Sequence, residues 1–329
     1  MELRGACIRG LGAYVPERVL TNDDLAKIVD TSDQWIVEHT GIRERRIAAD
    51  DQAASDLGVE AARRAIADAG IDPQDIGLII VATVSPDYPF PATSCLIQDK
   101  LGIRNTGAFD LVCGCTGWVQ ALATGSQFVQ AGSYDHVLVI SAETLSRITD
   151  WTDRSTCVLF GDGACAAVLG PCEPGQGLLS FAMDTSGEGA AHLAIPGGGG
   201  RMRMTPELLE QHMDCIKMNG HEVFKFAVRG CPEIAEKALD LAGIDPHQVD
   251  LMVTHQANLR IIDAAAKRLD IPYERLVINL DRYGNTSAAS IGIALDEYKR
   301  NHGIEPGAIV LLVAFGAGLA LAAAVFRWV

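Results

Sequence analysis

The sequence predicts an α/β fold built from two similar halves packed together. An internal repeat supports this: AIADAGIDPQDIGLIIV at Ala65–Val81 returns as ALDLAGIDPHQVDLMVT at Ala238–Thr254, displaced by 173 positions (243 − 70, from Gly70 to Gly243). Each copy reads as the end of an amphipathic helix, a stop signal and a buried strand. Solenoid repeats run only about 20–50 residues, so this long period indicates duplicated halves.

A second pair of segments extends the repeat. VLFGDGACAAVL at Val158–Leu169 resembles LVAFGAGLALAAAV at Leu312–Val325, and each reads as a strand, a Phe-Gly-x-Gly turn and a strand. The boundary between the halves is predicted near Gly170–Gly177, giving units of 1–173 and 174–329. The repeated strands are nearly continuous apolar runs, which is typical of sheets covered by helices on both faces.

Both ends of the sequence read as strands. Met1–Gly12 alternates and carries Arg4 and Arg9, which favours a first strand over a signal peptide. Ile309–Phe326 holds 18 residues without a charge (326 − 309 + 1), close to the length of a transmembrane helix. Its first half is rich in β-branched residues and FGAG interrupts its middle, so we expect a buried β-hairpin and no membrane span.

Three segments break the repeat, namely Leu20–Arg46, Ser85–Ile97 and Ala190–Met218. The last contains PGGGGRMRM, which is not a phosphate-binding loop because no Gly-Lys-Ser/Thr follows. We interpret that loop as a surface insertion. Insertions into a duplicated core are where substrate contacts are expected.

Composition narrows the class of protein. The formal net charge of −15 argues against nucleic-acid binding, which needs a basic surface. With 48% hydrophobic and 21% charged residues, the chain suits a globular protein with one large or two moderate cores. Nine cysteines, an odd number, argue against a disulfide framework and favour a reducing, cytoplasmic location.

Phe109–Leu122, FDLVCGCTGWVQAL, is a candidate nucleophile segment. A short apolar run leads into a turn at Gly114 and Gly117, and apolar residues at helical spacing follow. Cys115 would then lie at the positive end of a helix dipole, which favours the nucleophilic thiolate. The alternative is that the thiol packs as a small apolar group.

Two polar residues of the second half sit in similar places. His255 follows a buried strand in LMVTHQANLRII, and Asn285 lies in a turn before a helix in GNTSAAS. Alternatively, His255 has only a structural role and Asn285 is the N-cap of the helix that follows it. However, Cys115, His255 and Asn285 all lie at strand-to-helix junctions, and ligands of α/β sheets collect at the carboxyl ends of strands. The duplication would let all three converge on one site.

At this point the sequence resembles the β-ketoacyl-[acyl carrier protein] synthase III group of the thiolase-like superfamily. The resemblance covers essentially the whole chain, and its motifs are specific in their order and distances. They are DTSDQWIVEHTGIRERRIA at Asp30–Ala48, the C-x-G context of Cys115, TDRST at Thr152–Thr156, FGDGA, MNGHEVFKFAV at Met218–Val228, HQANLRII, GNTSAAS and FGAG.

The resemblance implies a thiolase-like duplicated fold, layered α-β-α-β-α, and a decarboxylative condensation that starts fatty-acid synthesis. Cys115 would accept an acyl group from coenzyme A, with acetyl-CoA as the default primer. Its backbone N–H and that of Ala317 would form the oxyanion hole. Neutral His255 and Asn285 would stabilise the enolate formed from malonyl-[acyl carrier protein]. No cofactor or metal is implied, and acyl-CoA is a substrate.

The same resemblance assigns the binding residues. Trp35 and Arg154 match the pair that stacks on the adenine of coenzyme A, and Phe90 matches an aromatic that closes the acyl pocket across a homodimer interface. Cys113 stands where a small residue is usual and is interpreted as packing. The predicted docking surface for the acidic carrier protein is a basic rim of Arg260, Lys225, Lys267 and Arg268.

The chain departs from the family pattern at three places. His39 replaces an arginine near the coenzyme A mouth, His221 replaces asparagine or arginine, and Ala320–Leu321 replace Thr-Trp beside the oxyanion loop. The last change is expected to affect the floor of the acyl pocket, and therefore the primer.

Other functions are compatible with parts of the sequence. A condensing or acyl-transfer enzyme of specialised metabolism would use the same three residues. An acyl-CoA thioesterase or cysteine hydrolase is a different class, because a Cys-His-Asn trio also suits hydrolysis. A zinc site of Cys113, Cys115 and His255 is a further alternative, but their spacing is not that of usual zinc ligands.

Overall fold

The computed structural model describes residues 4–329, and ten of its strands form one continuous sheet that divides into two five-stranded sheets. Across the first sheet the strands are β5 (Gly107–Leu111), β4 (Ile76–Ala82), β6 (His136–Glu143), β7 (Gly163–Cys172) and β1 (Gly5–Tyr14). Across the second they are β12 (Leu276–Val277), β11 (Leu251–Thr254), β13 (Ile309–Gly316), β14 (Ala320–Arg327) and β8 (Gly177–Thr185). Counted within each half, both orders are 3-2-4-5-1, which confirms the predicted duplication.

The two sheets meet at a single residue pair, Ala6 of β1 with Gly177 of β8. The chain crosses from one sheet to the other between Cys172 and Gly177, within the predicted boundary. The division into domains 1–173 and 174–329 stays a prediction. Of the first expected strand, Met1–Leu3 lie outside the described residues.

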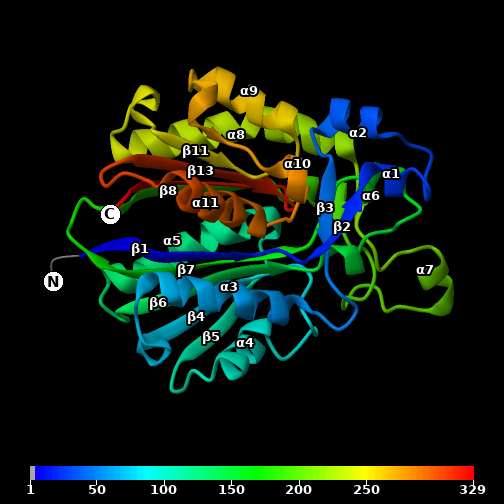
Figure 1. Cartoon of the computed structure of the whole chain (residues 1–329). Coiled ribbons are helices and arrows are strands. Elements are labelled where there is room, and N and C mark those ends of the chain that lie inside the picture. The colour runs from blue at the N-terminus through cyan, green and yellow to red at the C-terminus, as the bar shows by residue number, and fades with distance from the viewer. Residues whose placement is uncertain (1–3) are drawn as a thin grey trace.

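Helices and sheets alternate in five layers, as Figure 1 shows from top to bottom. Helices α8 (Gly220–Ala242) and α9 (Leu259–Leu269) cover the outer face of the second sheet. Helices α5 (Gly117–Gln130) and α11 (Ala289–His302) lie between the sheets, and α3 (Ala54–Ala69) and α4 (Thr93–Leu101) cover the first sheet. The layered α-β-α-β-α fold is therefore confirmed.

The central helices pack closely because small residues face their neighbours. Gly117 of α5 has so little space that an added Cβ would lie 2.9 Å from Ala82 Cβ. Gly292 of α11 faces Cys165 and Trp118 in the same way. Trp118 is completely buried between the sheets. Such dense packing holds the N-terminal end of α5, which carries the candidate nucleophile, in a fixed position.

The repeated A-G-I-D-P motif ends a helix in both halves. Gly70 after α3 (φ 65°) and Gly243 after α8 (φ 66°) adopt the left-handed conformation that glycine tolerates best. The aspartates that follow, Asp72 and Asp245, each accept a hydrogen bond from a backbone N–H two residues on. The motif therefore acts as a helix stop and a turn, as predicted.

The apolar segment near the end of the sequence forms the expected hairpin. β13 and β14 pair in antiparallel register from Ile309–Arg327 to Gly316–Ala320, and β14 also pairs with β8. Both strands are central in their sheet, which explains why they are apolar on both faces. Within residues 4–329, every helix is too short or too polar to cross a bilayer.

The prediction of a strand directly before FGDG is wrong. A short helix, α6 (Arg154–Cys157), precedes this motif, and Phe160 makes only an isolated bridge with Asn285. The neighbour of β7 in the sheet is instead β6, which ends at Glu143. The intervening segment leaves the sheet and runs to the candidate site, so the two halves differ here.

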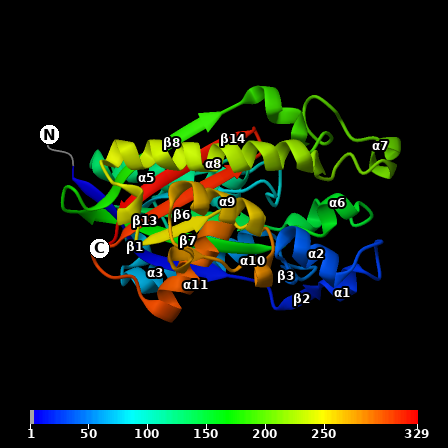
Figure 2. The ribbon, with the colours of Figure 1, turned by 90° about the horizontal axis from the view of Figure 1, so that it is seen from above.

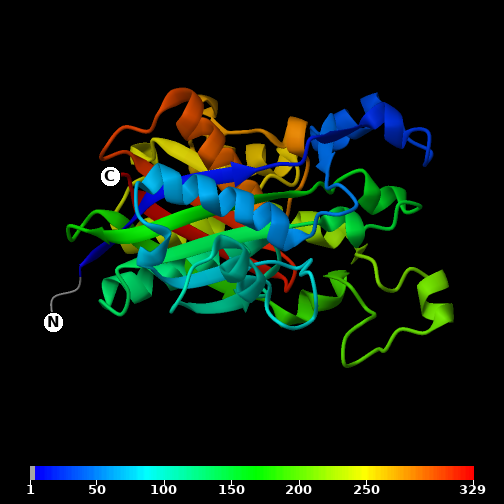
Figure 3. The ribbon, with the colours of Figure 1, turned by 60° about the horizontal axis from the view of Figure 1, so that its bottom comes forward.

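The remaining short elements gather at one end of the molecule, away from the two termini (Figures 2 and 3). They are β2 (Arg18–Thr21), α1 (Asn22–Leu25), α2 (Asp33–Thr40), β3 (Glu44–Ile47), α6, β9 (Leu193–Ala194), α7 (Pro206–Glu210), β10 (Lys217–Met218) and α10 (Leu280–Tyr283). Most belong to the three segments that break the repeat. Of these elements, β9 and β10 reach the candidate site, where Leu193 and Met218 line a cavity.

Candidate active site

Cys115 lies in a short 3₁₀ turn, Gly114–Thr116, between β5 and α5. Gly114 has φ 56°, and a Cβ there would lie 3.1 Å from the backbone nitrogen of Ala317. The Thr116 hydroxyl donates to the carbonyl of Cys113 (2.7 Å) and fixes the turn. The predicted strand, turn and helix therefore place Cys115 at the N-terminal end of α5.

The three predicted catalytic residues come together. Cys115, His255 and Asn285 line one cavity of about 150 Å³, although Cys115 and Asn285 are far apart in the sequence. Phe224 and Phe315 also line it. The duplicated sheets thus bring residues of both halves to one site.

A second, larger cavity of about 360 Å³ also has Cys115 in its lining. Its walls are mainly apolar and include Val112, Leu145, Ile148 and Ile216. Cys115 is therefore shared by a cavity with polar donors and a cavity suited to a hydrocarbon chain.

His255 is a buried, neutral imidazole. Its backbone N–H donates to the carbonyl of Val313 in β13 (2.8 Å), and Nδ1 lies 2.7 Å from Ser290 Oγ. Ser290 Oγ also accepts the N–H of Gln256 (3.3 Å), so its own hydrogen can point to Nδ1. The neutral ring then carries its proton on Nε2. Burial lowers the pKa of His255 to about 3, as expected for a neutral donor.

Asn285 is held by its backbone and by its side-chain oxygen. Its N–H donates to Leu159 (2.9 Å), and its carbonyl accepts the N–H of Gly161 (3.0 Å). Its Oδ1 accepts the N–H of Ser287 (2.8 Å), which leaves the Nδ2 group as the donor. α11 begins only at Ala289, so Asn285 is not its N-cap.

The FGAG turn lies against the nucleophile. A Cβ on Gly316 would lie 2.7 Å from the backbone nitrogen of Cys115, and one on Gly114 would lie 3.1 Å from that of Ala317. The backbones of Cys115 and Ala317 therefore pack face to face. This arrangement is compatible with the predicted pair of oxyanion donors.

Burial dominates the acidity of the nucleophile. It raises the pKa of the Cys115 thiol to about 12, whereas the dipole of α5 alone was expected to favour the thiolate. Burial thus opposes the effect of the helix dipole on the thiol. A proton acceptor is needed when it attacks a thioester.

Trp35 and Arg154, which are 119 residues apart in sequence (154 − 35), are in contact. The Arg154 guanidinium carbon lies 4.6 Å from the Trp35 ring centre, and its Nη1 donates to the carbonyl of Asp30 (2.9 Å). The His39 ring stacks on Trp35 at 4.4 Å with an angle of 19°. The structure thus forms a stack of flat groups where adenine binding was predicted.

Phe90 is 85% exposed and lines neither cavity of this single chain. Tyr88, which is close to Phe90 in the sequence, is also exposed. Val112, which lines the larger cavity, is exposed as well. An exposed aromatic fits the prediction that Phe90 acts across a subunit interface, which stays a prediction.

Only part of the predicted basic rim is available to contact a carrier protein. Arg260, Lys225 and Lys267 are exposed, and Arg260 Nη2 donates to the carbonyl of Glu38 (2.6 Å). Arg268 instead forms ion pairs with two acidic residues of α8, the shorter at 3.5 Å. Its charge is therefore partly neutralised.

The departures from the family pattern lie in different surroundings. Ala320 and Leu321 line neither cavity, and Leu321 packs against Gly230 of α8. They therefore do not form the floor of the acyl pocket. His221 is exposed beside Glu222 (3.1 Å).

Cys113 lines neither cavity, and burial raises its pKa. Within residues 4–329 no group of three or more His, Cys, Asp or Glu side chains is arranged to hold a metal ion.

Sequence reasoning missed Glu143 and Ser287, which lie close to Cys115. Glu143 is completely buried at the end of β6, and burial raises its pKa to about 7. Its sequence context is an ordinary strand end. Only the folded structure brings it near the nucleophile.

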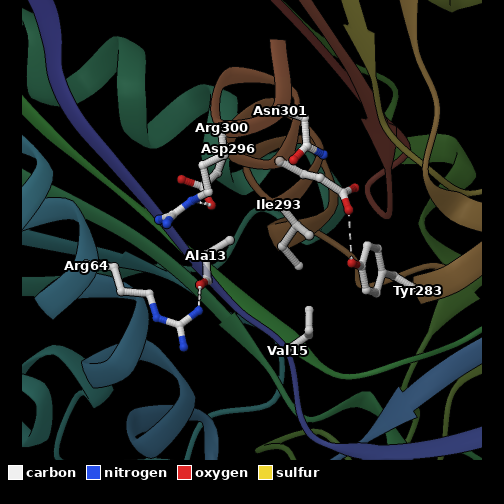
Figure 4. Close-up of a pocket in the computed structure, with 9 residues that line it drawn as sticks. Ala13, Val15, Arg64, Tyr283, Ile293, Asp296, Arg300 and Asn301 are labelled. Carbon is white, nitrogen blue, oxygen red and sulfur yellow. Dashed lines mark hydrogen bonds and ion pairs between the residues drawn. The ribbon is translucent and has the colours of Figure 1, made fainter. Parts of the chain in front are cut away.

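A separate cleft of about 270 Å³ lies between β1, α3 and α11 (Figure 4). Its charged side chains and the Tyr283 hydroxyl are already paired. Arg64 donates to Ala13 (2.6 Å), Arg300 to Asp296 (2.7 Å) and the Tyr283 hydroxyl to a glutamate of α11 (3.1 Å). None of the predicted site residues lines this cleft.

Comparisons with known proteins agree with this geometry. Residues 109–187 match the family 3-oxoacyl-[acyl-carrier-protein (ACP)] synthase III, and residues 239–328 match its C-terminal family. The chain is 52% identical over 327 residues to a β-ketoacyl-[acyl-carrier-protein] synthase III of Caldanaerobacter subterraneus subsp. tengcongensis, covering 99% of both chains. It is 51% identical over 328 residues to that of Symbiobacterium thermophilum, covering 100% of this chain and 99% of the relative.

A solved structure gives the same result. The β-ketoacyl-[acyl carrier protein] synthase III of Thermus thermophilus superposes with a TM-score of 0.91 at 46% identity, covering 98% of this chain and 99% of that one. Fold, cavity and sequence agree over nearly the whole length. The chain belongs to the 3-oxoacyl-[acyl-carrier-protein] synthase III family of condensing enzymes.

Proposed function

We propose that the chain is an acyltransferase that joins an acyl group from coenzyme A to malonyl-[acyl carrier protein]. The products are a β-ketoacyl-[acyl carrier protein], carbon dioxide and free coenzyme A, and the reaction initiates fatty-acid synthesis. The observation that carries the proposal is the position of Cys115 between the cavity that holds His255 and Asn285 and the apolar cavity.

In the first half-reaction Cys115 Sγ attacks the acyl-CoA thioester. The acyl chain enters the apolar cavity, whose volume of about 360 Å³ is much larger than an acetyl group requires. The backbone N–H groups of Cys115 and Ala317 stabilise the oxyanion. Acetyl-CoA is the default primer, and the cavity also suits longer or branched primers.

In the second half-reaction malonyl-[acyl carrier protein] loses carbon dioxide and the resulting enolate attacks the acyl-Cys115 thioester. His255 Nε2–H and the Asn285 amide donate hydrogen bonds to the thioester carbonyl. A histidine whose pKa is lowered to about 3 stabilises the enolate without protonating it. The neutral amide does the same.

Recognition uses the rim of the site. The adenine of coenzyme A would stack between the Trp35 indole and the Arg154 guanidinium, which must first separate from their 4.6 Å contact; flat faces and a cation favour such stacking. Arg260, Lys225 and Lys267 would attract an acidic carrier protein, with a smaller contribution from Arg268. The exposed Phe90 would be covered in a homodimer. We place the enzyme in the cytoplasm, where carrier-bound intermediates are made.

A thioesterase of the same fold is the second candidate, because acyl-Cys115 would also react with water. The mainly apolar lining of the acyl cavity favours condensation. An enzyme of specialised metabolism would differ in its primer, which the same experiment identifies.

Intact-protein mass spectrometry tests the proposal. The chain is mixed with acyl-CoAs of different length and branching, and malonyl-[acyl carrier protein] is then added. We expect an adduct on Cys115 that disappears with formation of the β-ketoacyl product. Cys115→Ser should form no adduct of comparable reactivity, and Cys113→Ser, the matched control, should react normally. An adduct that decays equally fast without malonyl-[acyl carrier protein] would show hydrolysis.

A further inference from the structure

Arg45 is a completely buried cation that the reaction described above does not use. It lies in β3, within GIRERRIA, and burial lowers the pKa of its guanidinium to about 10, so the group is charged at neutral pH. Its Nε has no hydrogen-bond partner in residues 4–329, and the adjacent Glu44 pairs with Arg46 instead (3.6 Å). Burying a charged group is costly unless its hydrogen bonds compensate. The hydrogen bonds that Arg45 does form therefore indicate its role.

The guanidinium of Arg45 joins two segments that are far apart in the sequence. Its Nη1 donates to the side-chain oxygen of Asn22 (2.9 Å) and to the carbonyl of Leu20 (3.3 Å). Its Nη2 donates to the carbonyl of Val158 (2.7 Å), directly after α6. Asn22 is itself held, because its amide donates to the carbonyl of Ile42 (2.8 Å). Arg45 therefore ties Val158 to the buried start of α1.

The residues that follow Val158 hold the backbone of Asn285. The Asn285 N–H donates to the carbonyl of Leu159 (2.9 Å), and the Asn285 carbonyl accepts the N–H of Gly161 (3.0 Å). Segment 158–161 belongs to no strand of the described structure, so it lacks the ladder of hydrogen bonds that fixes a sheet residue. The position of Asn285 therefore depends on what else holds this segment.

The stem of Arg45 packs against two glycines that adjoin Asn285. A Cβ added to Gly161 would lie 2.9 Å from the Cβ of Arg45, and one added to Gly284 would lie 3.2 Å from it. Gly284 directly precedes Asn285 in the sequence, and Gly161 donates to its carbonyl. Arg45 thus contacts the support of Asn285 through its stem and through its guanidinium.

We propose that Arg45 is a positioning residue for condensation, which holds segment 158–161 so that the Nδ2 group of Asn285 points to the malonyl thioester carbonyl. This inference rests on the proposed function, in which Asn285 stabilises the enolate. Arg45 lines neither cavity at Cys115, so it acts through Asn285 and touches no substrate. Acylation of Cys115, in which Asn285 takes no part, should not depend on Arg45.

Two substitutions test the guanidinium. Arg45→Lys keeps the charge, but a single ammonium group cannot bind Val158 and Asn22 together as the planar fork does. Arg45→Met removes the donors altogether. Arg46→Lys is the matched control, because Arg46 is the next residue of β3, its side chain points to the other face of the strand and it pairs with Glu44.

The two half-reactions are measured separately, on protein whose folding is checked by circular dichroism. Condensation is followed over one turnover of pre-acylated enzyme, and acylation is followed at saturating acyl-CoA. Since a misplacement of about 1 Å costs roughly 100-fold in rate, we expect condensation to slow about 100-fold in Arg45→Met and about tenfold in Arg45→Lys. Both should acylate Cys115 at the wild-type rate, and Arg46→Lys should be normal in both half-reactions. If Arg45→Met does not fold, Arg45→Lys alone decides.

A double variant shows whether the effect passes through Asn285. Adding Arg45→Lys to Asn285→Ala should slow condensation no further, because the side chain that Arg45 positions is already missing. A further loss in the double variant would show that Arg45 acts elsewhere.

Two other results would overturn this role of Arg45. Condensation of Arg45→Lys and Arg45→Met at the wild-type rate would show that the hydrogen bond to Val158 does not position Asn285. An equal loss in both half-reactions would indicate a generally distorted site. If Asn285→Ala itself condensed normally, the proposed enolate role of Asn285 would be wrong as well, whereas the other results leave that role intact.

Discussion

Replacing Gly316 by alanine would place a methyl group against the nucleophile. The new Cβ would lie 2.7 Å from the backbone nitrogen of Cys115, 2.9 Å from its Cβ and 3.2 Å from its Cα. Carbon atoms pack best at about 3.5–4.0 Å, so the two backbone segments must separate by roughly 0.7 Å. Neither backbone moves easily, because β13 is central in its sheet and α5 is packed between the sheets.

This shift would move Cys115 and Ala317 apart at the oxyanion position. A misplacement of about 1 Å costs roughly 100-fold in rate, and loss of one oxyanion donor costs about 10²–10³-fold. We therefore expect Gly316→Ala to acylate about 30- to 100-fold more slowly. Overpacking should also lower the free energy of unfolding by about 1–3 kcal/mol.

Single-turnover acylation, followed by mass spectrometry on the folded protein, measures the effect. Gly199→Ala is the control, since no atom lies within 4 Å of the Cβ it would add. If Gly316→Ala acylated within threefold of the wild-type rate, the close approach of the FGAG turn would not position the nucleophile.

Three other perturbations separate the roles of the site. His255→Ala and Asn285→Ala should leave the acylation rate unchanged and slow condensation, measured as carbon dioxide release, by roughly 100-fold or more. Slow acylation of these variants would contradict their role in stabilising the enolate. Trp35→Ala should raise KM for acyl-CoA about tenfold but not that for malonyl-[acyl carrier protein], and parallel changes would exclude an adenine contact. Burial raises the pKa of Glu143 from 4.5 to about 7, so protonation of this carboxyl favours the folded state. The stabilisation by the bound proton is complete below pH 4.5 and is lost as the pH rises through 7. Urea titrations should show a loss of about 3 kcal/mol over this range, which Glu143→Gln abolishes.

Short sequence motifs were sufficient to predict the duplicated architecture. The A-G-I-D-P repeat and the apolar hairpin predicted elements that the structure contains, because both depend on nearby residues. The strand expected at Val158–Phe160 was wrong because the first half inserts a long segment between β6 and β7. Pattern similarity cannot show whether a neighbouring strand is available for pairing.

The chemistry of the site depended more on tertiary contacts. The position of Cys115 at a helix start was predictable, but the rise in its pKa follows from burial by residues of both halves. Glu143 and Ser287 carry no sequence pattern that places them near the nucleophile. Their relation to Cys115 exists only once β6, α5 and the turn before α11 are packed together.

The order of strands in each sheet has a consequence for how the chain folds during synthesis. In the first half β1 pairs with β7 over Gly5 to Cys172, so this sheet is complete before β8 leaves the ribosome. In the second half β8 pairs with β14, which is made last. Helix α5 also lacks its neighbour α11 until residues 289–302 have been made. Such pairing across long sequence distances is slow, and the half-made chain exposes an apolar surface that chaperones bind.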